Sequence, residues 1–328
     1  MVGRVWRALG TGAVLAAGAA SYATWAEPRW FALRRVEVPC LPPGTRPLRV
    51  LHLSDLHLVP RQQLKRAFVE GLAALEPDLV IDTGDNLAAH DAVPALLDTL
   101  DGLLDVPGAF VLGSHDYFGP RPRNPLRYFD DNHPKPVRTG PAEPGQHGPG
   151  PDLDGDPQRL PTDDLVRGLT SRGWVDLTNA RARIEVAGVR LELVGVDDPH
   201  LRYDEYAVVA GPPAADADLK IGVTHAPYQR ILDAMSADGA RLLVAGHTHG
   251  GQLQVPFHGA LVTNCDLDTG RAAGLSRWWP GAGSYASATA PEHAAWLHVS
   301  AGLGANPYTP FRFCCRPEAT LLTLVPAA

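Results

Sequence analysis

Cysteine is scarce in this sequence, with four residues in 328, and no two of them have the CxxC spacing of a zinc ribbon. Cys314 and Cys315 are adjacent, and neighbouring cysteines do not bridge each other without strain. We therefore expect all four to be small buried apolar side chains. The cysteines do not indicate a redox compartment.

The sequence also lacks a surplus of positive charge. It has 29 lysines and arginines against 36 aspartates and glutamates, a net charge of −7. Proteins that bind nucleic acid through its phosphates have a basic surplus, so the composition argues against a nucleic-acid partner. Internal repeats are absent, and hydrophobic residues (45%) and charged residues (20%) are present in ordinary globular proportions.

Residues 8–26 form an uncharged run rich in Ala and Gly, preceded by Arg4 and Arg7. The run is just long enough to cross a bilayer, and it also resembles a secretory signal. We interpret residues 1–26 as an N-terminal membrane anchor, with a cleaved signal or a docked helix as alternatives. Arginines lie on both sides of the run, so the distribution of positive charge does not indicate how the segment would be oriented in a membrane. We expect a membrane-anchored protein and favour the extracytoplasmic side.

The rest of the chain alternates between strand and helix patterns. Residues 27–47 read as a linker, and buried strands are expected at 48–54, 77–85 and 108–116, with helices at 61–75 and 92–104 between them. This order predicts a parallel α/β core. Further strands are expected at 182–196, 218–227, 241–251, 294–304 and 318–326. We expect one domain at 48–326, interrupted by a flexible Pro/Gly-rich insertion at about 119–161.

Polar side chains recur where these strands end, which is the edge at which α/β sheets bind ligands. A single aspartate there is commonly a helix cap, and a single histidine is commonly a hydrogen-bonded structural residue. Five strand ends with such residues instead predict a metal site. The residues are Asp55, His57, Asp85, Ser114, His115, Asp116, His225, His247 and His249.

Carboxylates and imidazoles without thiolates suit Mn²⁺, Fe or Zn²⁺. The donors are too many for one tetrahedral zinc, so we expect two ions about 3.5–4 Å apart, bridged by a carboxylate. In "GHTHGGQ" (246–252) His247 and His249 are one residue apart, so one loop can serve both ions. The glycines around them allow the backbone to turn tightly.

The segments "DLH", "GDN", "GSHD", "THAP" and "GHTHGGQ", in this order, resemble the calcineurin-like metallophosphoesterase superfamily over residues 48 to about 325. The ending "SAGLGANPYTPFRFCCRPEATLLTL" looks like its bacterial membrane- or cell-wall-associated branch, which includes enzymes similar to UDP-2,3-diacylglucosamine pyrophosphatases. The resemblance implies an α/β/β/α sandwich with a dimetal site at the carboxyl ends of the strands.

The resemblance also implies roles for the residues. Asp55, His57 and His249 would bind the first metal, Asp85 would bridge, and His225 and His247 would bind the second. Ser114 stands where the family usually has an asparagine ligand, and a hydroxyl is a weaker donor than an amide carbonyl. His115 would act as general acid or stabilise the phosphoryl group, and Asp116 would orient it, with a turn or cap role for Asp116 as the alternative.

The implied function is metal-dependent phosphoester hydrolysis, as a phosphodiesterase or pyrophosphatase, with a metal-bridging hydroxide as nucleophile. The expected substrates are lipid-linked or envelope-derived phosphoesters. Phosphatase activity on nucleotides or phosphoproteins is an alternative. Another alternative is a catalytically weak metal-binding scaffold or sensor, because Ser114 replaces the usual ligand.

Four further polar residues have candidate roles. We interpret His52 as a core histidine and Asp197 and Asp198 as caps or supports of the site, with substrate contact as the alternative. Arg312 could bind a phosphate through its planar guanidinium, although a structural role is the simpler interpretation.

Overall fold

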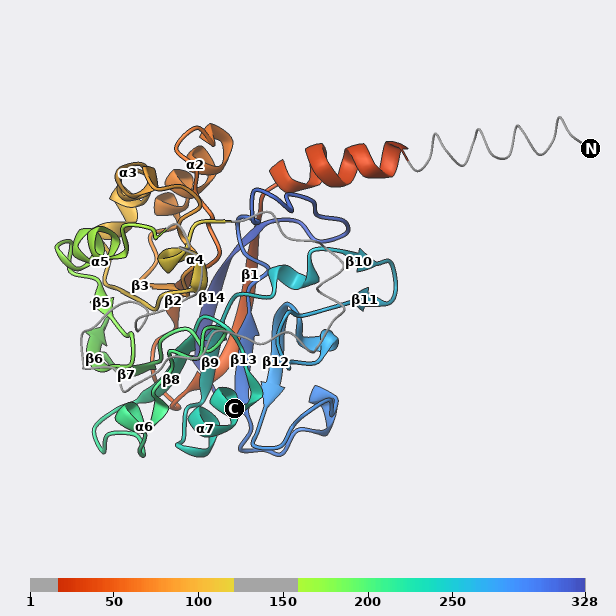
Figure 1. Cartoon of the computed structure of the whole chain (residues 1–328). Coiled ribbons are helices and arrows are strands. Elements are labelled where there is room, and N and C mark those ends of the chain that lie inside the picture. The colour runs from red at the N-terminus through yellow and green to blue at the C-terminus, as the bar shows by residue number, and fades with distance from the viewer. Residues whose placement is uncertain (1–16, 121–158, 328) are drawn as a thin grey trace, which may run out of the picture.

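The computed structural model describes residues 17–120 and 159–327, which contain two six-stranded sheets that face each other (Figure 1). The first sheet has the order β1-β14-β2-β3-β4-β5 and the second the order β12-β13-β9-β8-β7-β6. The strands of the first sheet are β1 (Ala32–Leu41), β14 (Glu318–Pro326), β2 (Leu48–Leu53), β3 (Leu79–Asp82), β4 (Gly108–Phe110) and β5 (Val175–Asp176). Those of the second are β12 (Gly274–Trp278), β13 (Ala295–Val299), β9 (Leu242–Ala245), β8 (Leu219–Thr224), β7 (Val189–Gly195) and β6 (Arg181–Val186).

Parallel strands form the centre of each sheet. Strands β2 to β5 run parallel, and so do β7, β8, β9 and β13. Strand β14 is antiparallel to β2, while β6 and β12 are antiparallel edges of the second sheet. The carboxyl ends of the parallel strands in a sheet therefore lie along one edge, where the polar segments of the sequence follow.

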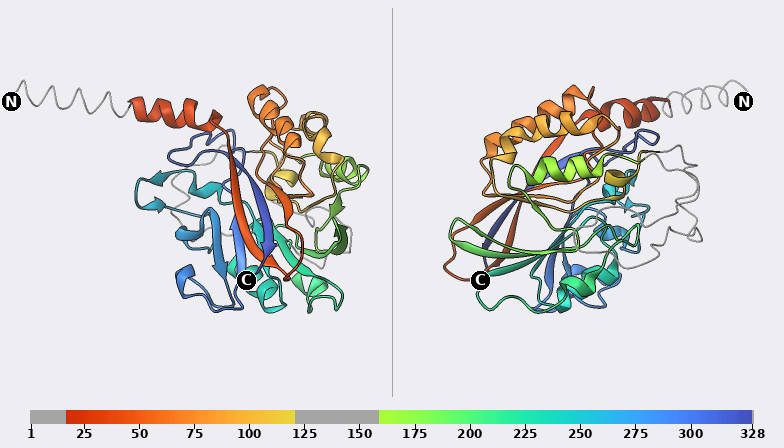
Figure 2. Two further views of the ribbon diagram at one scale, coloured as in Figure 1. Left: turned by 180° about the vertical axis from the view of Figure 1, so that it is seen from behind. Right: turned by 60° about the vertical axis from the view of Figure 1, so that its left-hand side comes forward.

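Helices cover the outer face of each sheet (Figure 2, right-hand view). Helices α2 (Gln63–Glu70), α3 (Ala92–Leu104) and α5 (Thr162–Thr170) lie on the first sheet, and α7 (Gln229–Ala237) lies on the second. Two single-turn helices, α4 (Ser114–Tyr117) and α6 (Tyr206–Val209), and a small hairpin of β10 (Gln254–Val255) and β11 (Gly259–Ala260) complete the named elements used below.

The alternation of side chains along each strand produces three apolar layers. In β2, Val50 packs between the two sheets, whereas Leu51 and Leu53 pack under the helices of the first sheet. In the second sheet Val244 lies between the sheets and Leu243 lies under α7. Strands buried on both faces need apolar residues at successive positions, which explains why the sequence shows continuous apolar runs here.

The layers are thus helix, sheet, sheet, helix. This confirms the α/β/β/α sandwich expected from the sequence, with the predicted strand at 48–54 and the helix at 92–104 observed as β2 and α3. The polar segments follow the strands at one edge of the sandwich.

The region 27–47 differs from the linker that we expected. Strand β1 (Ala32–Leu41) lies within it and pairs with β14 along nearly its whole length. Val38 and Leu41 are buried in the layer between the sheets, so this part of the range belongs to the first sheet. The Pro/Gly-rich insertion at 119–161 lies mostly outside the described residues.

The expected membrane-anchored localisation is corrected by the structure. Within residues 17–120 and 159–327, no helix has the length and apolar character needed to cross a bilayer. Residues 17–21 are α-helical and continue as a short π-helix, Tyr22–Ala26, and a 3₁₀ turn, Glu27–Arg29. The Glu27 carboxylate accepts the backbone N–H of Cys314 at 2.9 Å, which ties this segment to the C-terminal part of the chain.

A glycine at the contact between the sheets gives a test of this packing. A Cβ atom added to Gly195 would lie 2.5 Å from the Leu177 Cβ and 2.9 Å from the Val111 Cγ1. We predict that Gly195→Ala lowers the free energy of unfolding by about 1–3 kcal/mol through overpacking. Gly71→Ala is the matched control, because a Cβ atom there meets nothing within 4 Å. Denaturant unfolding of both variants checks this, and equal stabilities would contradict the packing.

Candidate metal centre

Loops that follow five strands bring the predicted site residues together. Asp55 follows β2, Asp85 follows β3, His225 follows β8 directly, and His247 follows β9. The loop after β4 begins α4, which carries Ser114, His115 and Asp116. These loops bound a cavity of about 160 Å³ that is lined by His57, Asp85, Ser114, His115, His247 and His249, among others.

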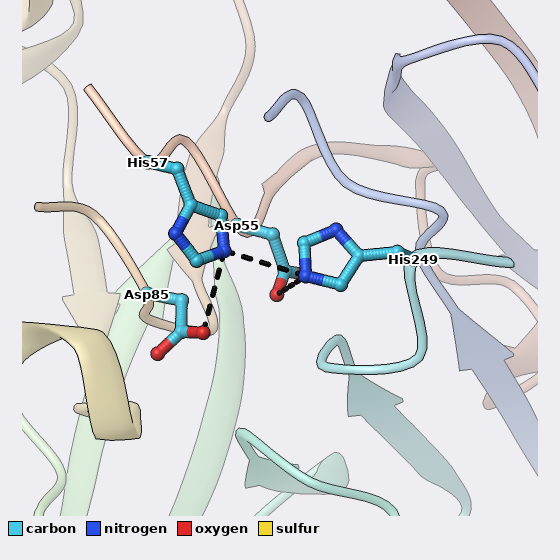
Figure 3. A group of neighbouring side chains, drawn as sticks. All are labelled: Asp55, His57, Asp85 and His249. Atoms are coloured by element: carbon cyan, nitrogen blue, oxygen red, sulfur yellow. Dashed lines mark hydrogen bonds and ion pairs between the residues drawn. The ribbon is translucent and has the colours of Figure 1, made fainter. Parts of the chain in front are cut away.

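Four of these residues form one compact group, the first donor group: Asp55, His57, Asp85 and His249 (Figure 3). One donor atom from each lies within 4.8 Å of every other. The His57 Nε2 is 3.3 Å from the His249 Nε2 and 3.4 Å from the Asp85 Oδ2, and the His249 Nε2 is 3.5 Å from the Asp55 Oδ1. Two carboxylates and two imidazoles at these separations fit one divalent ion.

The other oxygen of Asp85 faces away from His57 and His249 (Figure 3). This Oδ1 atom lies 3.5 Å from the His225 Nε2, and the His225 Nε2 lies 3.3 Å from the His247 Nδ1. We call Asp85, His225 and His247 the second donor group. Asp85 therefore belongs to both groups through different oxygen atoms, which is the arrangement of a bridging carboxylate.

Backbone carbonyls fix the ring nitrogens of the second donor group. The His225 Nδ1 donates to the Thr83 carbonyl at 2.7 Å, and the His247 Nε2 donates to the Asn264 carbonyl at 3.2 Å. Because a carbonyl only accepts, the opposite nitrogens carry lone pairs when the rings are neutral. These lone pairs would face each other at 3.3 Å, an arrangement that a proton or a metal ion between them stabilises. The same logic orients His249, whose Nδ1 donates to the Gly304 carbonyl at 3.0 Å.

The electric field of the buried carboxylates also favours a cation. Burial would lower the pKa of His225, but the carboxylates of Asp85, Asp198 and Asp55 outweigh it and raise that pKa to about 9. Burial, opposed by Asp55, lowers the pKa of His249 to about 4. Neutral imidazole is the form that binds a metal, so a divalent ion bound at His225 would have to displace the proton on this ring.

The donors are held in a backbone conformation that most residues avoid. Positive φ angles occur at Asp55 (51°), His57 (41°), Asp85 (57°), His247 (70°) and His249 (50°). Such a conformation costs about 1–2 kcal/mol per residue relative to the right-handed one. Strain gathered on the donor residues is typical of a functional site.

Glycine permits the close approach of the loops, as the sequence predicted. A Cβ atom on Gly246 would meet the Ser54 Oγ and lie 2.7 Å from the Asp55 Oδ2, so the loop after β9 could not otherwise reach β2. Gly250, at a φ of 61°, lets the chain turn directly after His249.

Asp116 is fully buried at the centre of a backbone network. Its carboxylate accepts the N–H groups of Asp85 and Asn86 at 2.8 Å each and of Gly113 at 3.0 Å. Burial, reinforced by the neighbouring Asp85, raises the pKa of Asp116 to about 8. The carboxyl group thus holds the loop that carries Asp85 against the start of α4.

His115 lies at the mouth of the site. Its ring centroid is 4.9 Å from that of His57, and its backbone N–H donates to the Asp85 Oδ1 at 2.7 Å. The His115 Nδ1 faces the Phe118 carbonyl at 3.1 Å, which turns the Nε2 towards the cavity. Ser114 lines the same cavity.

A buried hydrogen-bonded chain runs from the second sheet to the first donor group. The His298 Nδ1 on β13 lies 2.9 Å from the His52 Nδ1 on β2, and the His52 Nε2 lies 2.9 Å from the Thr83 Oγ1. Thr83 donates to the Ser54 Oγ at 2.7 Å, and Ser54 donates to the Asp55 Oδ2 at 2.6 Å. His52 is buried, as expected, but it also supports a predicted metal ligand.

Some residues of the site gave no recognisable sequence signal. Asn306 lines the cavity with its amide 3.5 Å from the His115 Nε2, and Asn264 orients His247 through its carbonyl. Both lie in irregular segments without a strand or helix pattern. Arg312 is buried and donates to the Ala301 carbonyl at 2.8 Å and the Gly302 carbonyl at 3.2 Å, which agrees with the structural interpretation.

Comparison with known proteins identifies the family to which the chain belongs. The calcineurin-like phosphoesterase family matches residues 48–251, more than half of the chain. The chain therefore belongs to the calcineurin-like phosphoesterases and is an enzyme that hydrolyses phosphoesters with divalent metal ions.

Two relatives are similar along nearly their whole length. Phosphodiesterase YaeI of Escherichia coli is 27% identical over 314 residues, covering 93% of this chain and 92% of the relative. The uncharacterized metallophosphoesterase YkuE of Bacillus subtilis is 23% identical over 329 residues, covering 97% and 93%. Among solved structures, a 5'-nucleotidase precursor from Thermus thermophilus has a TM-score of 0.42 at 14% identity, covering 85% of this chain and 55% of that one.

Removal of the Asp116 carboxylate tests its part in the network. We predict that Asp116→Ala lowers the free energy of unfolding by about 3 kcal/mol or more, because three buried N–H groups lose their acceptor. It should also reduce metal content, since the loop that carries Asp85 loosens. Thermal unfolding and elemental analysis check both effects. Asp163→Ala, an exposed change on α5, is the control and should match the parent in both.

The buried histidine pair predicts acid sensitivity. Burial lowers the pKa of His298 to about 4, below its value in the unfolded chain. Its stabilising contribution is therefore complete above about pH 6.5 and disappears as the pH falls towards 4, a loss of about 3 kcal/mol. In metal-free protein, His298→Gln should reduce the stability difference between pH 7 and pH 4.5, as measured by urea unfolding. Exposed His293→Gln should leave it unchanged.

Proposed function

We propose that this chain is a phosphodiesterase or pyrophosphatase that uses two divalent ions, Mn²⁺, Fe or Zn²⁺, and a water-derived hydroxide as nucleophile. The observation that carries the proposal is Asp85, whose two oxygens face two different sets of imidazoles at 3.4 and 3.5 Å. The name of the relative YaeI supports phosphodiester hydrolysis.

The residues divide between the two ions. The first donor group would hold one ion, and the second donor group would hold the other, with Ser114 as a weak hydroxyl donor. When bound, the ions supply an activated water at neutral pH and positive charge opposite the phosphoryl oxygens. The fixed rings of His225, His247 and His249 need no reorganisation, since backbone carbonyls already orient them.

His115 would protonate the leaving oxygen. Its Nδ1 is held by the Phe118 carbonyl, so the Nε2 is the atom available to the substrate. The Asn306 amide beside this atom would position the ring or the leaving group. Asp116 would act on His115 through the backbone, because it fixes the start of α4 and the loop that carries Asp85.

The cavity wall favours a phosphoester with an apolar portion. Leu253, Leu261 and Phe311 line the cavity together with the donor residues, and Leu253 and Leu261 are 39% and 46% exposed. Solvent-facing apolar side chains beside a charged site would contact the non-phosphate part of the substrate. We therefore propose a lipid-linked or envelope-derived phosphoester as the substrate class.

Turnover of bis-p-nitrophenyl phosphate tests the proposal. With Mn²⁺ added, the purified protein should hydrolyse the diester, and His115→Ala should lower kcat by about 10²–10⁴-fold, because the general acid is lost. The metal content of this variant should stay at the parental value, since His115 is outside both donor groups.

His293→Ala is the matched control, because this exposed histidine precedes β13 at the opposite end of the strand from the site. It should keep the parental rate. A parent that binds metal but shows no turnover would favour the scaffold or sensor alternative. Equal rates for parent and His115→Ala would refute the role of His115.

A further inference from the structure

The second donor group is poor in strong ligands compared with the first. It has one oxygen of Asp85 and two imidazoles, and the neighbouring Ser114 offers a hydroxyl. The first donor group has two carboxylates and two imidazoles. A neutral hydroxyl attracts a divalent ion less than a carboxylate does, because hard cations prefer anionic oxygen. The inference below rests on the proposed two-ion function and concerns what completes this second group.

Asp198 lies in the loop that follows β7, the strand next to β8, which ends at His225. Its side chain is completely buried. One oxygen, Oδ1, accepts the backbone N–H of His200 at 2.8 Å. The other oxygen, Oδ2, is buried and has no hydrogen-bond partner within the described ranges. A buried carboxylate oxygen without a partner lowers the stability of the fold. We therefore expect this oxygen to contact a bound group that is not part of the protein.

The surroundings of Asp198 belong to the second donor group. After burial itself, the groups that act most strongly on its carboxyl are His225 and Asp85, two of the three members of that group. The ring of His200, two residues further along the loop, lies 4.6 Å from the ring of His247, the third member. The loop after β7 therefore lies against the second donor group.

Two neighbouring carboxylates fit this position less well. Asp197 already has partners, since its Oδ1 accepts the Tyr117 hydroxyl and the Asp198 N–H at 2.8 and 2.7 Å. Asp82 also has an unpartnered buried oxygen among the described residues, but it is the last residue of β3, and the first charged group that acts on it is Asp55 of the first donor group.

We propose that Asp198 is a ligand of the second ion, with its Oδ2 as the donor atom, in place of the amide that Ser114 lacks. The ligand set would then contain three carboxylates for two divalent ions. A carboxylate in place of a neutral amide strengthens the second site and lowers its net charge. Ser114 can then leave room for substrate without loss of the ion.

Metal binding by the parent protein and three variants separates the roles of Asp198 and Ser114. Mn²⁺ titration by calorimetry, with elemental analysis after gel filtration, should give two ions for the parent. Asp198→Asn should keep the first ion and weaken the second by more than about 10-fold. Ser114→Ala, which removes only a weak hydroxyl donor, should keep both ions and weaken the second much less than Asp198→Asn does. Asp197→Asn is the matched control, because it removes the adjacent carboxylate charge and retains an oxygen for Tyr117; it too should keep both.

The outcomes are distinct. Parental affinity for both ions in Asp198→Asn would overturn the proposal, and so would a weakening of the second ion in Ser114→Ala that equals or exceeds the weakening in Asp198→Asn. If Asp198→Asn does not fold, as judged by circular dichroism, the Ser114→Ala result decides: retention of the second ion supports Asp198, and loss of that ion refutes it. A parent that binds one ion or none would refute the two-ion function itself, and with it this assignment.

Discussion

The carboxylate of Asp85 is the point at which the two donor groups meet. Its Oδ2 faces His57 and its Oδ1 faces His225, while its backbone N–H is held by the Asp116 carboxylate. Asp55, His57 and Asp85 follow strands of the first sheet, whereas His225, His247 and His249 follow strands of the second, so the relative position of the sheets fixes both donor groups. The apolar layers, which hold the two sheets in place, therefore also determine whether both oxygens of Asp85 can contact their partners at the same time.

This arrangement of the donors requires backbone conformations that aspartate and histidine do not prefer. Five donor residues have positive φ, and their carboxylates and imidazoles lie close together, mostly buried. Such strain persists because large apolar layers on both sides of each sheet determine where the loops begin and end. Divalent ions would relieve the repulsion among the carboxylates, so binding the ions and stabilising the fold are linked.

The local patterns predicted the strand–helix order and the polar residues at the strand ends, because apolar runs that end in Asp or His can be read from the sequence alone. The sandwich was expected from the family resemblance. The sequence did not predict β1 as a strand of the first sheet, since an exposed edge strand such as "ALRRVEV" has little apolar character. The sequence also did not predict the surroundings of Asp198. Its buried oxygen without a partner is a property of the folded loops of the second sheet and has no local sequence pattern. Most of the expected anchor lies outside the described residues, and among the described residues no helix has the length and apolar character to cross a bilayer.

The position of β14 bears on how the enzyme is made. This strand lies between β1 and β2, although it comes from the far end of the sequence, and its residue Leu322 pairs with Val50. During synthesis β2 leaves the ribosome long before β14 exists, so the first sheet can close only after β14 has been made. Asp55, in the loop after β2, reaches its final position only then. The ions would therefore bind after β14 has joined the sheet, because an earlier nascent chain offers them scattered ligands instead of a site.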